Sequence, residues 1–328
     1  MIRKSGLIIS TIGFLFMGVI SAHGPGNKEL TGQDLSLALK PDLSIGVEDG
    51  EENYIFGNIS RLALDGVGNI YVLDYKYRVV RVFDEGGAWL RSTEVPAGQG
   101  PREAINPAGI AVTPGGTLFI NDRLKVIVYG PEGGYLHTFK TDFRISCIGC
   151  AGTEECVAIG PNDGRILHLY DAEGRCLKSF GEYFPMPREL DDFKGRPMFS
   201  APLLFNASGD GRIFVLNPHK YEISVFKNGE AEATIQGKND NFKPVRQMGR
   251  GFVSTATYIV RSGDLTLVLL SNPNPNAPKI LDVFQGNSQV GTLEAGGTPL
   301  AVDSRKRIYF EEEGDFPKVV RYTLVKNQ

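Results

Sequence analysis

The chain has little of what common catalytic sites require. It contains four histidines in 328 residues, and neither a Gly-x-Ser-x-Gly nucleophile elbow nor a His-Glu-x-x-His zinc motif occurs. Only His219 falls at an expected loop tip, so a histidine-rich zinc site cannot be assembled from the sequence. We therefore expect no catalytic residue, no bound metal and a protein that is not an enzyme.

Long apolar runs are also scarce, and the one clear example lies at the start of the chain. Arg3 and Lys4 precede the apolar residues 7–20, and Ser21 and Ala22 supply small residues for cleavage. This is the layout of a secretory signal peptide cleaved after Ala22. The run is shorter than the about 20 residues of a membrane-spanning helix. An uncleaved anchor is the alternative interpretation.

Excess positive charge is absent as well. The chain holds 35 Lys and Arg against 38 Asp and Glu, and loss of residues 1–22 would leave 33 against 38, a net charge of −5. This balance gives no reason to expect a nucleic-acid partner. We expect a periplasmic or secreted monomer without a membrane span after cleavage. Its partner would be a small molecule, a glycan or another protein.

Four cysteines cluster in one short region, at Cys147, Cys150, Cys156 and Cys176. An even number in an exported chain indicates disulfides or buried thiols, and zinc is the weaker alternative because the second Cys-x-x-Cys of a zinc ribbon is missing. Cys150 and Cys156 flank an expected hairpin, so we predict a bridge between them. Four cysteines allow three connectivities, and the sequence alone does not choose.

What the chain does contain is a repeated phrase. Residues 68–90 read GNIYVLDYKYRVVRVFDEGGAWL, and residues 116–136 read GTLFINDRLKVIVYGPEGGYL. Each has a glycine turn, an apolar strand, a polar tip, a second apolar strand and another glycine turn. Repetition at this period predicts stacked supersecondary units. The 40 glycines and 19 prolines fit many short strands joined by turns.

Six such units can be marked along the chain by their second strand. These strands are expected at residues 69–74, 117–122, 155–160, 212–217, 265–271 and 307–312. We predict an all-β, six-bladed β-propeller of four-stranded antiparallel blades over residues 43–328, after a signal peptide (1–22) and a lead segment (23–42). The last unit has three strands, so we expect a strand from residues 43–56 to close the ring.

The repeat resembles NHL repeats, and more narrowly the secreted bacterial six-bladed propellers related to them. Residues 68–74, 79–84, 98–103 and 107–112 carry this resemblance. It implies the propeller fold, but it implies function poorly because propellers host binding modules, lyases and lactonases alike. The Glu, Asn and Asp metal ligands of lactonase-type propellers cannot be matched residue by residue.

We call the four strands of each predicted blade a to d, in their order along the unit. This order separates the two ends of the blade. The connections between strands b and c, and from strand d to the next strand a, are long and varied and share one face, which we predict to be the working face. Arginine and aromatic side chains suit recognition. The ligand-binding residues predicted on this face are Tyr75, Tyr77, Arg102, Arg123, Arg188, His219, Tyr221 and Arg246.

Two acidic features of this face have ordinary structural explanations. Asp74 and Asp122 recur at the end of strand b, and each is expected to cap the backbone of its own turn rather than form a carboxylate ring. The acidic residues 311–315 could hold Ca²⁺, although a solvated charge run is the favoured interpretation. The predicted function is a non-catalytic ligand-binding or protein-interaction module; the alternative is a metal-dependent lyase or lactonase-type hydrolase at the channel mouth.

Overall fold

The computed structural model of the protein describes residues 37–185, 188, 205–207, 210–248, 251–253, 256–270, 279–312 and 314–326. Nearly all regular structure in these residues is β-strand, with one short 3-10 turn, η1 (Glu52–Tyr54). None of the helical structure in this part of the chain could cross a bilayer. The expected signal peptide, and the lead segment up to residue 36, lie outside the described residues.

Six four-stranded antiparallel sheets, called blades 1 to 6 here, make up the fold. Blade 1 contains β2 (Ile59–Leu64), β3 (Ile70–Asp74), β4 (Val79–Phe83) and β5 (Trp89–Glu94). Blade 2 contains β6 (Gly109–Val112), β7 (Leu118–Asp122), β8 (Lys125–Tyr129) and β9 (Tyr135–Lys140). Blade 3 contains β10 (Cys147–Ala151), β11 (Glu155–Asn162), β12 (Arg165–Tyr170) and β13 (Cys176–Glu182).

The second half of the chain repeats this organisation. Blade 4 contains β14 (Phe205–Ala207), β15 (Arg212–Leu216), β16 (Glu222–Lys227) and β17 (Glu230–Gln236). Blade 5 contains β20 (Ala256–Ser262), β21 (Leu265–Leu270), β22 (Lys279–Gln285) and β23 (Ser288–Ala295). Blade 6 contains β24 (Thr298–Val302), β25 (Arg307–Glu312), β26 (Lys318–Lys326) and β1 (Leu37–Ile45), and a hairpin of β18 (Arg246–Met248) and β19 (Gly251–Val253) lies between blades 4 and 5 in the sequence.

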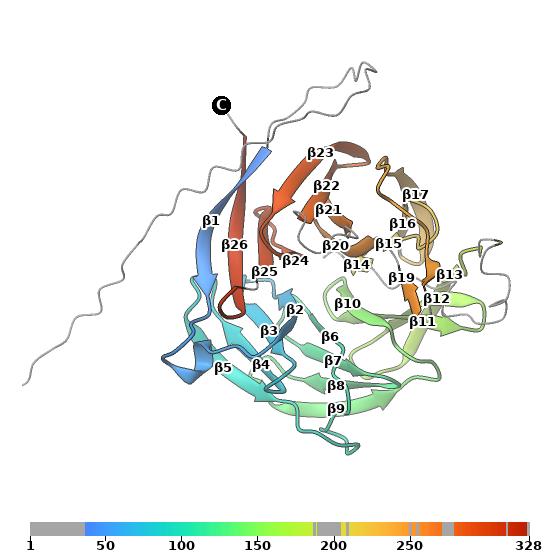
Figure 1. Cartoon of the computed structure of the whole chain (residues 1–328). Coiled ribbons are helices and arrows are strands. Elements are labelled where there is room, and N and C mark those ends of the chain that lie inside the picture. Colours follow the sequence, from blue (N-terminus) through green and yellow to red (C-terminus); the bar gives the residue numbers. More distant parts are fainter. Residues whose placement is uncertain are drawn as a thin grey trace, which may run out of the picture. The chain divides into compact units, whose positions relative to one another are not determined.

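The first strand of each blade faces the centre of a ring. β2 neighbours β6, β6 neighbours β10, and the series continues through β14, β20 and β24 back to β2. Figure 1 shows the blades following one another around this ring, with blade 1 in blue beside blade 6 in red. The predicted six-bladed propeller is therefore confirmed, and each predicted second strand matches its observed counterpart to within about two residues at either end.

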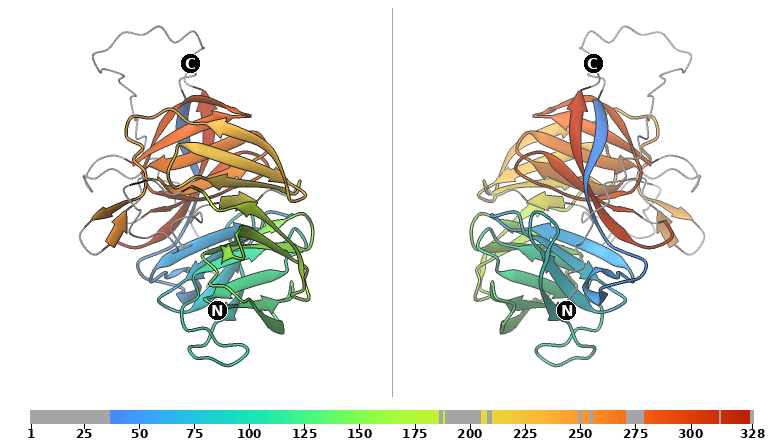
Figure 2. Two further views of the ribbon diagram at one scale, coloured as in Figure 1. Left: turned by 90° about the vertical axis from the view of Figure 1, so that its right-hand side faces the viewer. Right: turned by 90° about the vertical axis from the view of Figure 1, so that its left-hand side faces the viewer.

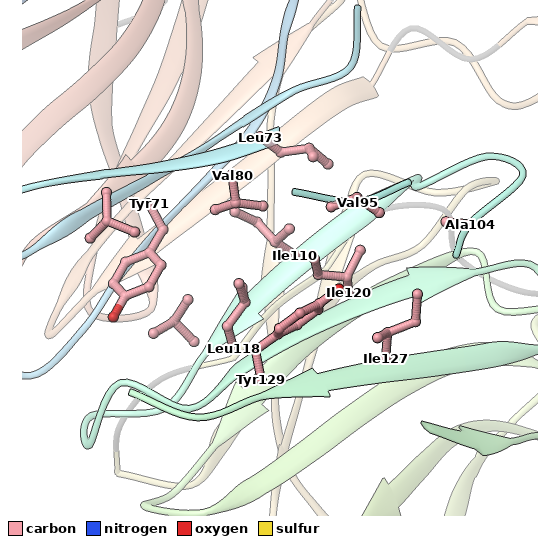
Figure 3. Packing of buried hydrophobic residues seen from close by; sticks show 12 residues of the cluster. Tyr71, Leu73, Val80, Val95, Ala104, Ile110, Leu118, Ile120, Ile127 and Tyr129 are labelled. Carbon is pink, nitrogen blue, oxygen red and sulfur yellow. The ribbon is translucent and has the colours of Figure 1, made fainter. Parts of the chain in front are cut away.

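Apolar side chains between neighbouring blades hold the ring together. β3 is buried along its whole length, because blades cover both of its faces, whereas the outer strand β5 is mostly exposed. Between blades 1 and 2, Tyr71 and Leu73 pack with Ile120 and Tyr129, as Figure 3 shows. Comparable clusters fill the other junctions between blades. Each blade depends on its neighbours for a buried face, as repeat architectures require.

The closing strand comes from earlier in the chain than residues 43–56. β1 pairs with β26 from Leu37, opposite Lys326, to Ile45, opposite Val319. Its large apolar residues, Leu37, Leu39, Leu43 and Ile45, all fall at odd positions in the sequence, and a bulge between Pro41 and Leu43 shifts the register of pairing. Proline is tolerated because β1 is the edge strand. Closure by an N-terminal strand is confirmed, but the predicted range was wrong beyond residue 45.

The tight turns explain the repeated glycines. Gly68 and Gly116 occupy the same place in the a–b turns of blades 1 and 2, with φ of +93° and +88°, whereas Gly152 lies two places earlier in the turn of blade 3, with φ of +87°. Residues with a side chain rarely adopt this left-handed backbone. Because strands alternate in direction, all a–b and c–d turns lie at one end of the blades, and all b–c tips and d–a connections lie at the other; Figure 2 shows the blades from the side.

Candidate functional site

The aspartates at the ends of the b strands are structural. Asp74 is fully buried and accepts hydrogen bonds from the backbone N–H groups of Gly57 (2.8 Å) and Asn58 (3.1 Å). Its Oδ2 also lies 3.0 Å from Nη1 of Arg81. Asp122 makes the equivalent backbone bonds in blade 2. Asp74 also accepts from the backbone N–H of Tyr77 in its own turn (3.1 Å), as predicted. The bonds from the segments before β2 and β6 were not predicted, and they tie these two b–c tips to the start of their own blades.

Four predicted ligand-binding residues on the b–c and d–a face are exposed in blades 1 and 2. Tyr75 and Tyr77 are 41% and 48% exposed, and the Tyr75 hydroxyl donates to Asn106 Oδ1 at 3.0 Å. Arg123 is exposed at a b–c tip with φ of +56°. The exposed Arg102 lies 5.6 Å from the ring centroid of Tyr135 on the outer strand β9, so it sits toward the rim of the blade.

The remaining predicted residues are less available. His219 and Tyr221 are each 8% exposed. The Tyr221 hydroxyl donates to Asp282, and its ring stacks on Phe242 with centroids 5.0 Å apart. Burial raises the pKa of Asp282, and the hydrogen bonds from Tyr221 and Asn239 offset only part of this effect. Tyr221 therefore helps join blade 4 to blade 5, and neither His219 nor Tyr221 offers much flat surface to a ligand.

Arg188 and Arg246 come from the two longest d–a connections. Arg188 is exposed, and Arg246 begins β18, where only the backbone falls in the described part of the chain. The structure therefore brings no cluster of the eight predicted residues into one described pocket. Their role in binding stays a prediction.

A cavity opens at the other end of the ring. It has a volume of about 850 Å³ and is lined by residues from all six blades. The a–b turns contribute residues 65–68 of blade 1 and residues 303–305 of blade 6, and the strands of blade 4 contribute Phe214, Val225 and Ala233. A second cavity of about 280 Å³ lies along the a strands, beside Arg61 and Tyr258. Together the two cavities follow the central channel.

Ion pairs surround the wide end of this cavity. Arg307 lies 2.6 Å from Asp303 and 2.7 Å from Glu85, which also pairs with Arg305. The hydrogen bond from Arg307 lowers the pKa of Glu85. Across the mouth, Arg212 pairs with Glu232 at 2.6 Å. Charges of both signs thus surround the opening. We call the residues that line this cavity, among them Glu85, Arg212 and Arg307, the turn-side mouth.

Arg261 is a half-buried cation of the turn-side mouth. Its guanidinium carbon lies 4.0 Å from the ring centroid of Phe214, and one of its N–H groups donates to Thr266. Burial lowers the pKa of this arginine. A guanidinium stacked on a ring keeps its in-plane donors directed at its surroundings. Arg261 is therefore positioned in the wall of the cavity by contacts from blades 4 and 5.

Sequence reasoning missed the turn-side mouth because it treated all a–b turns as equivalent hairpins. The signal was a departure from the repeat. Blades 1 and 2 have glycine-rich turns at residues 65–69 and 113–117, but blade 6 has Asp-Ser-Arg-Lys-Arg at 303–307. In that turn Lys306 takes the left-handed conformation with φ of +62°. Replacing the usual glycine in this way places three cations on one turn.

Two of the four cysteines line the same channel from blade 3. Cys147 and Cys150, on the innermost strand β10, border the narrower cavity, and Cys150 also borders the wider one. Cys156 lies directly opposite Cys150 on β11 and is fully buried, while Cys176 is exposed on β13. All four are thiols in this structure. The predicted bridge remains a prediction, although its two residues are neighbours.

No group of three or more His, Cys, Asp or Glu side chains in the described residues is arranged to hold a metal ion. In the acidic segment considered for Ca²⁺, Glu312 accepts a hydrogen bond from the Tyr322 hydroxyl near β26 and lies 3.6 Å from Lys318. Glu313 lies outside the described residues.

Comparison with known proteins agrees with the fold. Residues 49–158 match the family DUF5128, described as a 6-bladed beta-propeller. No curated protein matches the chain. A candidate exported protein of Bacteroides fragilis superposes with a TM-score of 0.60 at 11% identity, covering 91% of this chain and 97% of that one. A DUF4221 member from Bacteroides vulgatus gives 0.60 at 9% identity, covering 90% and 100%. At such identities the likeness shows the propeller fold alone.

Proposed function

We propose that this chain is an exported, non-catalytic propeller that binds a small polar ligand at the turn-side mouth of its channel. The observation that carries the proposal is the cavity of about 850 Å³ lined by all six blades. Ligand pockets usually span about 300–1,000 Å³. A six-bladed propeller is in general an interaction-type module, and a site built from every blade needs the closed ring.

The charge pattern points to a class of ligand. Arginines of the turn-side mouth lie beside carboxylates, as Arg307 lies beside Asp303 and Glu85, so positive and negative charges nearly balance in the lining. Such a lining offers both donors and acceptors without a strong net field. A neutral or zwitterionic ligand with many polar groups, such as an oligosaccharide or short peptide, suits it better than a highly charged ion.

The b–c and d–a face is the competing location. The sequence predicted binding there, and exposed Tyr75, Tyr77 and Arg123 support contact with a protein partner. Neither of the two cavities is lined by residues of this face, so we place the small ligand at the opposite end. Variants on the two faces separate the alternatives.

Export of the protein and its relationship to NHL-repeat propellers are parts of the same proposal. The signal-peptide pattern of residues 1–22 supports export, and so does the likeness to the candidate exported protein of Bacteroides fragilis. The repeated glycine turns and b strands support kinship with NHL repeats. The alternative of a metal-dependent lyase or hydrolase is tested by metal analysis of the purified protein, where stoichiometric metal would favour it.

A ligand screen read by thermal unfolding tests the proposal. A panel of oligosaccharides, short peptides and dicarboxylates is added to the purified protein, and we expect at least one of the first two classes to raise the Tm. A ligand that binds only the folded state stabilises it by about 2.7 kcal/mol at a hundred times its Kd.

Matched variants then locate the site. Arg305→Ala and Asn287→Ala change exposed residues of the turn-side mouth and should raise the Kd by roughly tenfold. Glu132→Ala, on an exposed c–d turn outside the cavity lining, should leave the Kd unchanged. If Tyr75→Ala and Arg123→Ala abolish binding while the mouth variants do not, the ligand binds the other face.

A further inference from the structure

We propose that Cys150 and Cys156 form a single disulfide that is made through the central channel. The bridge would join the first two strands of blade 3, with Cys150 as the thiol that meets the oxidant. Cys147 and Cys176 would remain thiols. This inference does not depend on the ligand of the turn-side mouth, because it rests on strand register and burial alone.

The hydrogen-bond pattern of the a–b hairpins sets the first condition. In blade 1 the N–H of Asp65 donates to the carbonyl of Asn69 at 3.2 Å, which closes a five-residue turn. Hydrogen-bonded and non-hydrogen-bonded pairs alternate in an antiparallel ladder, so the next pair inward, Leu64 and Ile70, is non-hydrogen-bonded. The same bond closes the turns of blades 2 and 6, from Thr113 to Thr117 and from Asp303 to Arg307.

Blade 3 has a turn of the same length. Ala151 pairs with Glu155 at its ends, and Cys150 pairs with Cys156 one step further in. The two cysteines therefore occupy the non-hydrogen-bonded position, where Cα atoms are about 4.5 Å apart and side chains lie closest. Disulfides span Cα separations of about 4.4–6.8 Å. The pair can be bridged without moving the backbone.

The other pairings fail on geometry. Cys147 lies opposite Ile159 and packs with the cluster between blades 3 and 4, whereas Cys150 and Cys156 face the cluster between blades 2 and 3. Cys176 lies opposite Tyr170, and Tyr170 lies opposite Cys156 on its other side. Cys176 and Cys156 are therefore separated by two strand spacings of about 4.8 Å each. That distance exceeds the about 7 Å limit for Cα atoms. One connectivity remains.

Burial fixes the order of the chemical steps. Cys150 borders both cavities, while Cys156 is fully buried, so an oxidant in the channel reaches Cys150 first. The Cys150 thiolate attacks one sulfur of a low-molecular-weight disulfide and releases one thiolate. Cys156 then loses its proton and attacks the Cys150 sulfur, which expels the second thiolate. Two electrons pass from the protein thiols to the two released thiols.

The environment makes this reaction slow at neutral pH. Burial raises the pKa of the Cys150 thiol and that of Cys156 as well. The thiolate is the attacking species, so below the pKa the rate of bridge formation should rise roughly tenfold for each pH unit. Oxidation should therefore be far faster at pH 9 than at pH 7.

Oxidised glutathione and thiol alkylation provide the test. Reduced protein is incubated with oxidised glutathione at pH 9, denatured and treated with N-ethylmaleimide. We expect Cys147 and Cys176 to be labelled, and Cys150 and Cys156 to be protected until reductant is added. A glutamate-specific protease cuts between the bridged residues after Glu154 and Glu155, and its two fragments should remain joined until reduction.

Serine variants control the assignment. The double variant Cys147→Ser, Cys176→Ser should form the bridge at the wild-type rate. Cys156→Ser should accumulate a glutathione adduct on Cys150, whereas Cys150→Ser should form neither adduct nor bridge at Cys156. Labelling of all four cysteines after incubation at pH 9, or a bridge that forms in Cys150→Ser, would overturn the proposal.

Discussion

At the scale of single residues, the same side-chain type does different work at the two ends of a blade. Asp74 accepts backbone hydrogen bonds inside the protein, where its partner Arg81 is only 7% exposed. Asp303, at the other end, accepts from its own turn and pairs with Arg307 beside the cavity. Position in the repeat, not residue type, decides whether a carboxylate is structural or lines the proposed site.

The buried pair of Asp74 and Arg81 gives a prediction about stability. Asp74→Ala leaves the arginine charge without its partner inside the protein, and we expect a loss of about 3–5 kcal/mol in the free energy of unfolding. Asp122→Ala removes the same backbone bonds in blade 2, where the nearest cation, Lys125, is 4.0 Å away. That variant should lose about 1–3 kcal/mol.

Urea unfolding of both variants measures the difference. Equal losses in the two variants would mean that the ion pair with Arg81 contributes nothing beyond the backbone bonds, and the account of blade 1 would be wrong.

At the scale of elements, β1 has the largest consequence because it completes blade 6. It pairs with β26 over nine residues of chain, and Asp42 adds a bond of 2.7 Å to Nε of Arg321. Without β1, the backbone groups of β26 would form an open edge. The closing strand should therefore control cooperative unfolding of the ring.

Removing β1 and returning it as a peptide tests this role. A variant without residues 37–45 should lose its single cooperative thermal transition. A synthetic peptide of residues 37–45 should restore it by adding a strand to the open edge. The same peptide with Leu39→Asp and Ile45→Asp, which places charges among apolar neighbours, should not. A deletion variant that melts like the intact protein would contradict closure by β1.

The strands differ in how far the sequence could predict them. β3, β7 and β25 follow glycine or polar turns and are buried or nearly so, so local pattern was sufficient. The bounds of β1 were mispredicted because its partner, β26, lies near the opposite end of the chain. Pairing between such distant residues leaves no local signal.

At the scale of the whole molecule, the candidate site is a property of the ring. No single turn of the turn-side mouth carries a recognisable motif, and the cavity arises only when six a–b turns converge. The sequence could rank loops by length and variety, which favoured the b–c and d–a face. It could not show which end of the channel is hollow, because that depends on how neighbouring blades pack.

Protection of Cys150 by a ligand tests the central claim most directly. In reduced protein, Cys150 borders the channel while Cys176 is exposed on the outer strand and serves as an internal reference. The rate of N-ethylmaleimide labelling is measured at each cysteine with and without a saturating ligand from the screen. The account predicts that bound ligand slows labelling of Cys150 and leaves that of Cys176 unchanged. Unchanged labelling of Cys150 at saturation would show that the ligand does not occupy the channel.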